Sequence, residues 1–218
     1  MVAIDARAPL YDGGICTRID CVSLGVVVNR EARRFYDEGE DFWPKRYAIW
    51  GRLVAQQPEQ IAYSVIDSKV LGRFMPSVFP PIKADTIEQL ANALELSPNT
   101  LRETVDTFNR AVVPGSFNHQ VLDDCRTTGD LKPPKTHWAQ KIDTPPFMGY
   151  ALRPGIIDTE IHDSSGIKGR VKLMRDAIPM KREGTAEEVA DAIMWIRMGL
   201  TSSQGQPSRI SGCLSRTN

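Results

Sequence analysis

Apolar side chains recur at helical spacing in two consecutive segments near the middle of the chain. The first segment begins where Asp85 precedes Glu88 by three residues, a spacing typical of a helix start, and its apolar stripe consists of Ile87, Leu90, Ala91 and Leu94. The second begins at Ser97-Pro98, and its inward face consists of Leu101, Val105 and Phe108. The pattern therefore predicts two adjacent helices that form a helical hairpin.

Other patterns are shorter or less regular. Residues 22–28, VSLGVVV, form a β-branched run that predicts a buried strand, and Asn29-Arg30 follows as a turn. Residues 37–52 mix charged residues with Phe42, Trp43, Tyr47 and Trp50 without a clean stripe. Exposing so many aromatic faces is unfavourable, so we expect a structured segment that lines a cleft. Residues 113–146, rich in Gly and Pro, predict an irregular connection.

The last third of the chain differs from the rest in its residue composition. Thr185 and Glu188 have capping-box spacing, and the apolar residues that follow predict a helix over about residues 186–197. Residues 199–218 are polar and rich in Ser and Gly. Few apolar side chains there offset the backbone entropy of ordering, so we expect a disordered tail.

Composition narrows the class of protein. The chain has 218 residues, and Lys+Arg and Asp+Glu both total 27, which removes the usual electrostatic basis for binding nucleic acid. The absence of a long apolar run predicts no membrane span, and the first residues do not form a secretory signal. Four cysteines without a C-x-x-C pair complete the prediction of a reduced, cytoplasmic protein.

Several common catalytic motifs do not occur. The sequence contains no G-x-G-x-x-G turn, and the nearest substitutes, Gly13-Gly14 and the pair Gly166 and Gly169, are typical of ordinary turns and loops. No histidine lies four residues from another beside a glutamate, so we predict no metal site. A G-x-S-x-G nucleophile elbow is also missing.

Residues 1–155 resemble an internal piece of the fumarate reductase and succinate dehydrogenase flavoprotein family, on the branch of the FAD-dependent tricarballylate dehydrogenases. The stretches that carry the resemblance are DARAPLYDGGICTRID, LGVVVNREARRFYDEGEDFWPKRYAIWG, ADTIEQLANALELSPNTLRETVDTFNRAV and TPPFMGYALRPG. The pattern D-T-x-E-x-L-A followed by L-x-x-T-V-x-x-F-N is specific to the mobile substrate-capping domain of these enzymes. The resemblance implies an FAD-binding domain split in sequence around the cap, with a dicarboxylate or tricarboxylate substrate bound between them.

The resemblance also implies a site residue. Arg46 corresponds to the family's active-site arginine, which follows an R-F-x-x-E stretch that here spans residues 34–38. The spacing is several residues longer than in fumarate reductases, which leaves Lys45 and Arg52 as alternatives. In that family the arginine passes protons to and from a substrate carbon. A guanidinium holds its proton tightly, so a neighbouring acid, Glu40 or Asp41, would exchange it.

Each of these residues also has a plainer interpretation. Arg46, Lys45, Glu40 and Asp41 would form ordinary surface ion pairs, a common arrangement that contributes about 0–1 kcal/mol. Arg18 would be a bidentate carboxylate clamp or, as we favour, a surface residue.

Residues 153–213 resemble a different family, the C-terminal end of the short-chain dehydrogenases/reductases. There P-G-x-I-x-T follows a strand and contacts the nicotinamide side of NAD(P), which would assign cofactor binding to Pro154, Gly155, Ile157 and Thr159. The stretch over residues 178–190 is equally typical. The glycine-rich start and the Tyr-x-x-x-Lys pair of that family are missing. Both families share R-P-G-I, so the chain is interpreted as two fragments joined at that place.

These observations predict an α+β fold, with a flavoprotein capping-type domain over residues 1–152 and a short C-terminal strand-loop-helix appendage within residues 153–213. The predicted function is that of a fragment or fusion derived from an FAD-dependent oxidoreductase that acts on a tricarboxylate or dicarboxylate, inactive alone because both glycine-rich motifs are absent. One alternative is an NAD(P)-dependent module related to the short-chain reductases. The other is a non-catalytic interaction protein that self-associates through an uncovered apolar face.

Overall fold

The computed structural model describes residues 2–8 and 17–155, with the single positions 182, 185, 187, 190 and 194. The strands are β1 (Val2–Asp5), β2 (Val26–Asn29), β3 (Ala62–Ile66), β4 (Ile82–Ala84), β5 (Val112–Val113), β6 (Arg126–Thr127) and β7 (Phe147–Gly155). The helices are α1 (Trp43–Ala55), α2 (Ile87–Ala93) and α3 (Pro98–Ala111), with short 3₁₀ turns at Val22–Leu24, Pro58–Gln60 and Ser68–Val70. Helices together with antiparallel sheets confirm the predicted α+β class.

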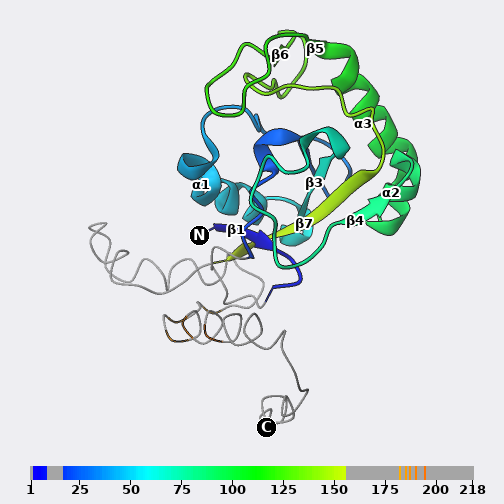
Figure 1. Ribbon diagram of the computed structural model, residues 1–218. Coiled ribbons are helices and arrows are strands. Elements are labelled where there is room, and N and C mark those ends of the chain that lie inside the picture. The colour runs from blue at the N-terminus through cyan, green and yellow to red at the C-terminus, as the bar shows by residue number, and fades with distance from the viewer. Residues whose placement is uncertain are drawn as a thin grey trace, which may run out of the picture.

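The main sheet is built around β7, its longest strand (Figure 1). The strand order is β1-β7-β3-β2, and β4 pairs with the N-terminal part of β7. Every pairing is antiparallel, and β1 pairs with the C-terminal end of β7, where Val2 lies opposite Gly155. The predicted domain boundary at residue 153 therefore falls within a continuous strand.

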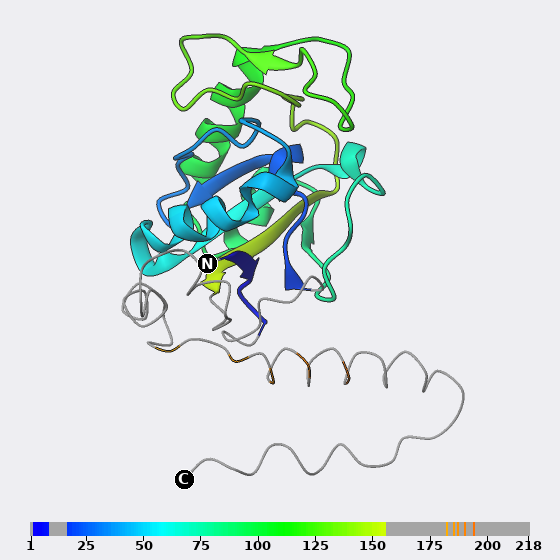
Figure 2. The ribbon, with the colours of Figure 1, turned by 90° about the vertical axis from the view of Figure 1, so that its left-hand side faces the viewer.

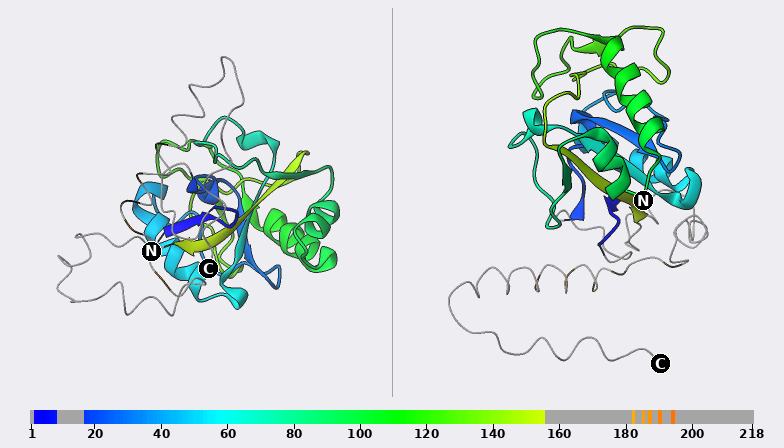
Figure 3. Two further views of the ribbon diagram at one scale, coloured as in Figure 1. Left: turned by 90° about the horizontal axis from the view of Figure 1, so that it is seen from below. Right: turned by 90° about the vertical axis from the view of Figure 1, so that its right-hand side faces the viewer.

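The helices lie on opposite faces of this sheet, with α1 on one side and the α2–α3 pair on the other (Figures 2 and 3). Successive strand residues alternate between the two faces, as the pleat requires. In β2, Val27 faces the α1 side while Val26 and Val28 face the α2–α3 side. The α1 side buries Trp50 and Met148, among others, and each face of the sheet thus has its own apolar core.

The predicted helical hairpin is confirmed, with one cap shifted by a residue. At α3, Ser97 Oγ accepts a hydrogen bond from the backbone N–H of Thr100 at 3.4 Å, and proline occupies the first turn. At α2 the capping residue is Thr86 rather than Asp85. Thr86 Oγ1 accepts from the N–H of Gln89 at 3.1 Å, while the Gln89 side chain accepts from the N–H of Asp85 at 3.2 Å. The two side chains satisfy donors on either side of the helix start.

Two other predictions need correction. The expected strand over residues 22–28 is a 3₁₀ turn followed by β2, because the chain bends at Gly25, where an added Cβ would lie 2.1 Å from the Val65 carbonyl oxygen. The aromatic-rich segment, for which no helix was predicted, contains α1. Its buried residues Trp43, Trp50 and Val54 are seven and four residues apart, which is a helical spacing. The irregular connection predicted over residues 113–146 is confirmed apart from β5 and β6.

The helix expected over residues 186–197 lies mostly outside the described residues, and the tail over 199–218 lies wholly outside them. Within the described part of the chain, no helix has the length and apolar character needed to cross a membrane.

Candidate functional site

Arg46 lies in the first turns of α1 and belongs to a chain of ionisable groups. Its Nη2 atom is 2.8 Å from Glu40 Oε1, and Glu40 Oε2 accepts a hydrogen bond from the hydroxyl of Tyr36 at 2.8 Å. The hydrogen bond to Glu40 is the main reason that the pKa of Tyr36 is raised, because the phenol then keeps its proton beside the carboxylate. Arg46 Nε is buried and has no hydrogen-bond partner among the described residues. This network of Tyr36, Glu40 and Arg46 therefore ends at a guanidinium whose buried Nε–H group donates to no described residue.

The other candidates around Arg46 are arranged differently. Lys45 pairs with Asp41, at 3.2 Å between Nζ and Oδ1, and the lysine side chain is mostly exposed. Asp41 also accepts the N–H of Phe42, and this backbone hydrogen bond is the largest cause of its lowered pKa. The structure thus pairs Arg46 with Glu40 and Lys45 with Asp41. Arg52, the third alternative, is exposed in the last turn of α1 and forms no ion pair with a described residue. These ion pairs are expected whether Arg46 is catalytic or simply pairs with an acid, so they do not distinguish the two interpretations. The feature that ordinary ion pairing does not explain is the buried Nε of Arg46, which has no hydrogen-bond partner among the described residues.

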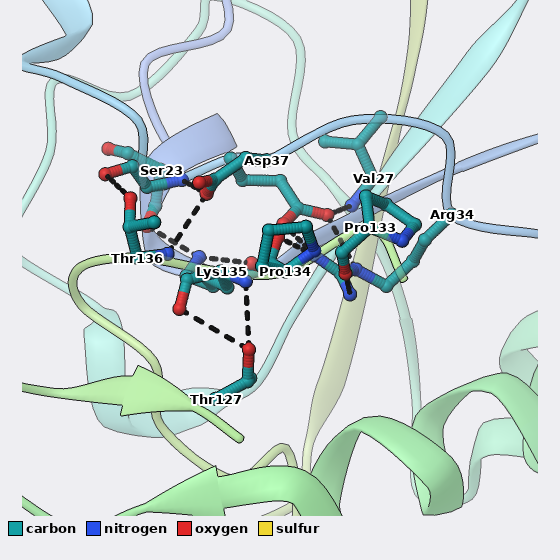
Figure 4. A network of polar contacts seen from close by, with 12 residues as sticks. Ser23, Val27, Arg34, Asp37, Thr127, Pro133, Pro134, Lys135 and Thr136 are labelled. Carbon is teal, nitrogen blue, oxygen red and sulfur yellow. Dashed lines mark hydrogen bonds and ion pairs between the residues drawn. The ribbon is translucent and has the colours of Figure 1, made fainter. Parts of the chain in front are cut away.

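The first and last residues of the R-F-x-x-E stretch, Arg34 and Glu38, form a buried ion pair within a network of polar contacts (Figure 4). Arg34 and Glu38 make two hydrogen bonds, of 2.9 and 2.6 Å, and both side chains are almost completely buried. Glu38 also accepts the N–H of Val27 at 2.8 Å, while Arg34 donates to the carbonyl of Pro133 at 2.7 Å. The pair therefore joins β2 to a segment about a hundred residues later in the chain.

Lys135 lies in that later segment. No sequence pattern singles it out, because it is one lysine in a Pro-rich connection. It is 1% exposed, and its Nζ donates to the carbonyls of Ser23 at 2.8 Å and Gly25 at 2.6 Å. Burial lowers its pKa to about 8, because a charged amine is costly to remove from water.

The residues between Arg34 and Arg46 are fixed by the same segment. Asp37 Oδ1 accepts the N–H groups of Gly39 at 2.8 Å and of Thr136 at 3.1 Å. Thr136 Oγ1 in turn donates to the carbonyl of Gly39 at 2.9 Å. An added Cβ on Gly39 would lie 2.2 Å from the carbonyl oxygen of His137, so only glycine allows the approach. These contacts hold the backbone immediately before Glu40.

A pocket of about 190 Å³ lies at the N-terminal end of α1. Its lining residues are Asp20, Ser23, Leu24, Phe42, Trp43, Pro44, Arg73, Phe74, Met75, His119 and Trp138. The prediction that the aromatic segment lines a cleft is therefore confirmed for Phe42 and Trp43. Tyr47 and Trp50 do not line this pocket, and Trp50 is buried in the core.

Arg18 is already engaged by a neighbouring acid. Its Nε and Nη2 atoms lie 2.5 and 2.8 Å from the two carboxylate oxygens of Asp20, and its guanidinium lies 5.3 Å from the ring centre of Tyr47. The fork that would clamp a substrate carboxylate is thus occupied by an internal one, as expected of the non-clamp interpretation.

The residues predicted to contact NAD(P) are only partly described. Pro154 and Gly155 are buried at the end of β7, opposite Ala3 and Val2 of β1. Ile157 and Thr159 lie outside the described residues, so this cofactor site stays a prediction.

The described residues do not fit the pyrophosphate of a dinucleotide such as FAD. A cradle needs glycines that leave room for close backbone approach, next to free amides at a helix start. Gly25 and Gly39 are instead packed against protein carbonyls, and the starts of α2 and α3 are capped by Thr86 and Ser97. The start of α1 has no side-chain cap, but Gly39, the glycine that precedes it, is packed against the carbonyl of His137. In this part of the chain there is also no group of three His, Cys, Asp or Glu side chains that could hold a metal ion.

Comparisons with known proteins give partial matches. No family model matches the chain. A 45-residue stretch is 56% identical to the uncharacterized oxidoreductase YgfF of Escherichia coli K12, covering 21% of this chain and 18% of that protein. The chain thus spans less than a fifth of this relative.

Three solved structures are similar at low identity. The open conformation of a flavocytochrome c3 fumarate reductase is 17% identical, with a TM-score of 0.49, over 86% of this chain and 30% of that one. A 3-ketosteroid-Δ4-(5α)-dehydrogenase from Rhodococcus jostii RHA1 is 20% identical, with a TM-score of 0.45, over 62% and 26%. A 3-ketosteroid Δ1-dehydrogenase from Sterolibacterium denitrificans is 15% identical, with a TM-score of 0.46, over 73% and 33%. The chain therefore covers about a third of each structure or less.

Proposed function

We propose that the described domain is the substrate-capping domain of an FAD-dependent oxidoreductase that oxidises a tricarboxylate or dicarboxylate, and that Arg46 carries the proton exchanged with the substrate. The sequence resemblance over residues 1–155 supports the family. The observation that carries the residue assignment is the chain from Tyr36 through Glu40 to Arg46, which ends at a buried, unpartnered Nε.

Each member of this chain has a separate role in the proposal. Arg46 holds a proton close to the substrate carbon and attracts the substrate carboxylates by its charge. Glu40 is in direct contact with Arg46 and is the group that exchanges a proton with it. Tyr36 donates to the other oxygen of Glu40 and so fixes the direction in which the carboxylate faces. The proposal places the flavin on a separate FAD-binding domain, as in the family that residues 1–155 resemble, so that this chain is inactive alone.

A domain transplant tests the proposal. The capping segment of a working tricarballylate dehydrogenase is replaced by residues 1–155 of this chain, which keep β7 whole, and oxidation of tricarballylate is followed by dye reduction. We expect the hybrid to turn over and Arg46→Gln to lower kcat by about 10²–10⁴-fold, the usual range for loss of a general acid or base. Arg110→Gln is the matched control, because Arg110 is an exposed arginine in the last turn of another helix, α3.

Two outcomes would overturn the proposal. A hybrid that keeps its flavin but does not oxidise tricarballylate would show that this domain is no cap for such a substrate. An Arg46→Gln hybrid as fast as the Arg110→Gln hybrid would show that Arg46 only forms an ion pair with Glu40.

A further inference from the structure

The pocket of about 190 Å³ beside Trp43 lies outside the Tyr36–Glu40–Arg46 network, and two of its walls are tryptophan rings held by hydrogen bonds. Trp138 is 2% exposed, and its indole N–H donates to the carbonyls of Asn118 at 3.1 Å and Val121 at 2.8 Å. The indole N–H of Trp43 donates to Asp20 at 2.6 Å. Both polar edges are therefore satisfied by protein groups, and the rings offer apolar surface to an occupant.

The two charged residues that line this pocket, Asp20 and Arg73, differ in their partners. Asp20 is the single acid among the lining residues, and both of its oxygens already accept hydrogen bonds, from Arg18 and from Trp43. Arg73, in contrast, makes no ion pair with any described residue; its guanidinium lies 4.9 Å from the ring centre of Phe117. His119 stacks on the same ring at 6.5 Å with an interplanar angle of 25°. Arg73 and His119 both pack on the ring of Phe117, so two side chains with N–H donors lie at the same pocket.

We propose that this pocket binds a small monocarboxylate with a planar, apolar body. The body lies against the aromatic walls, and the carboxylate accepts hydrogen bonds from Arg73 and His119. The volume is that of roughly six water molecules, so the ligand has to be small. A tricarboxylate fits less well, because its other carboxylates would face apolar walls without donors. The proposal is independent of the Arg46 chain and of the proposed function.

Benzoate is the probe, and the tryptophan indole N–H resonances of the intact, isotope-labelled chain are the readout. The chain has four tryptophans, of which Trp43 and Trp138 line the pocket while Trp50 is buried in the core. We expect benzoate to shift the Trp43 and Trp138 signals in a saturable way and to leave Trp50 unchanged. Benzamide, which has the same shape without the charge, should bind at least about tenfold more weakly.

Variants test the role of the guanidinium. Arg73→Gln should raise the Kd for benzoate by about tenfold or more, whereas Arg52→Gln, the matched loss of one exposed arginine, should leave it unchanged. Both positions are exposed, so neither substitution disturbs a core. The proposal is overturned if benzoate and benzamide bind equally, if Arg73→Gln binds like the parent, or if about 10 mM benzoate moves neither indole signal. Because no flavin is involved, these failures are distinct from failure of the domain transplant.

Discussion

The buried amine of Lys135 should make the stability of this domain depend on pH in an unusual direction. Among the described residues, its Nζ donates to two acceptors, the carbonyls of Ser23 and Gly25. A neutral amine still has two N–H groups, so deprotonation removes the buried charge without breaking either hydrogen bond. Loss of the proton therefore relieves the cost of burial, which is the main cause of the pKa of about 8.

The sign and size follow from the two pKa values of this group. The folded-state pKa is about 8 and the ordinary value is 10.5. Between these pH values the unfolded chain binds a proton that the folded chain has released, so stability rises with pH and the penalty returns in full below about pH 8. At about 1.4 kcal/mol per pKa unit, the rise amounts to about 3 kcal/mol overall and about 2 kcal/mol between about pH 7.5 and about pH 9.5.

Urea unfolding of the parent and of Lys135→Met at these two pH values measures the effect. The variant leaves two buried carbonyls without donors, so at the lower pH we expect it to be less stable by about 2–4 kcal/mol. The difference should widen by about 2 kcal/mol at the higher pH, because only the parent gains from deprotonation. Groups common to both proteins, such as Cys21, whose pKa burial raises to about 12, cancel in the comparison. A difference that stays constant or narrows would refute the reasoning.

Two further substitutions test the packing and the capping of the fold. Gly25→Ala places a Cβ 2.1 Å from the Val65 carbonyl oxygen and should destabilise the domain by about 3 kcal/mol. Gly129→Ala is the control and should be nearly neutral, because its Cβ meets nothing within 4 Å. Equal melting temperatures for the two variants would contradict the close approach at Gly25. Ser97→Ala removes the side-chain cap of α3 and should lower the free energy of unfolding, measured with urea, by about 1 kcal/mol. Ser97→Asp should keep most of the stability, because aspartate is also a good capping residue. An unchanged urea midpoint for Ser97→Ala would show that the cap contributes nothing.

The helical hairpin could be predicted because its signals are local. Ser97-Pro98 specifies a helix start by itself, and Leu101, Val105 and Phe108 repeat at helical spacing. The cap of α2 was misplaced by one residue because Asp85 and Thr86 are both good capping residues, and the backbone geometry at Thr86 decides between them. Helix α1 was missed because charged residues interrupt its aromatic face, although Trp43 and Trp50 already lie two turns apart.

The site could be predicted only in part. The sequence identified Arg46 and two candidate acids, but the choice between Glu40 and Asp41 depends on a loop that Thr136 holds from a hundred residues away. The buried Lys135 gave no signal, because a single lysine in a Pro-rich segment is usually solvated. The pocket joins segments distant in sequence, and nothing local connects Arg73 with Trp138.

The most direct test of whether this chain supplies a substrate cap without a flavin site is a flavin titration of the intact protein. The chain is mixed with excess FAD, dialysed, and assayed for bound flavin absorbance and for tricarballylate-dependent dye reduction. We predict that no flavin is retained and that no dye is reduced, because the sequence contains no G-x-G-x-x-G turn and Gly39, the glycine before α1, is packed against a protein carbonyl. Stoichiometric bound FAD together with turnover of tricarballylate would contradict this result directly.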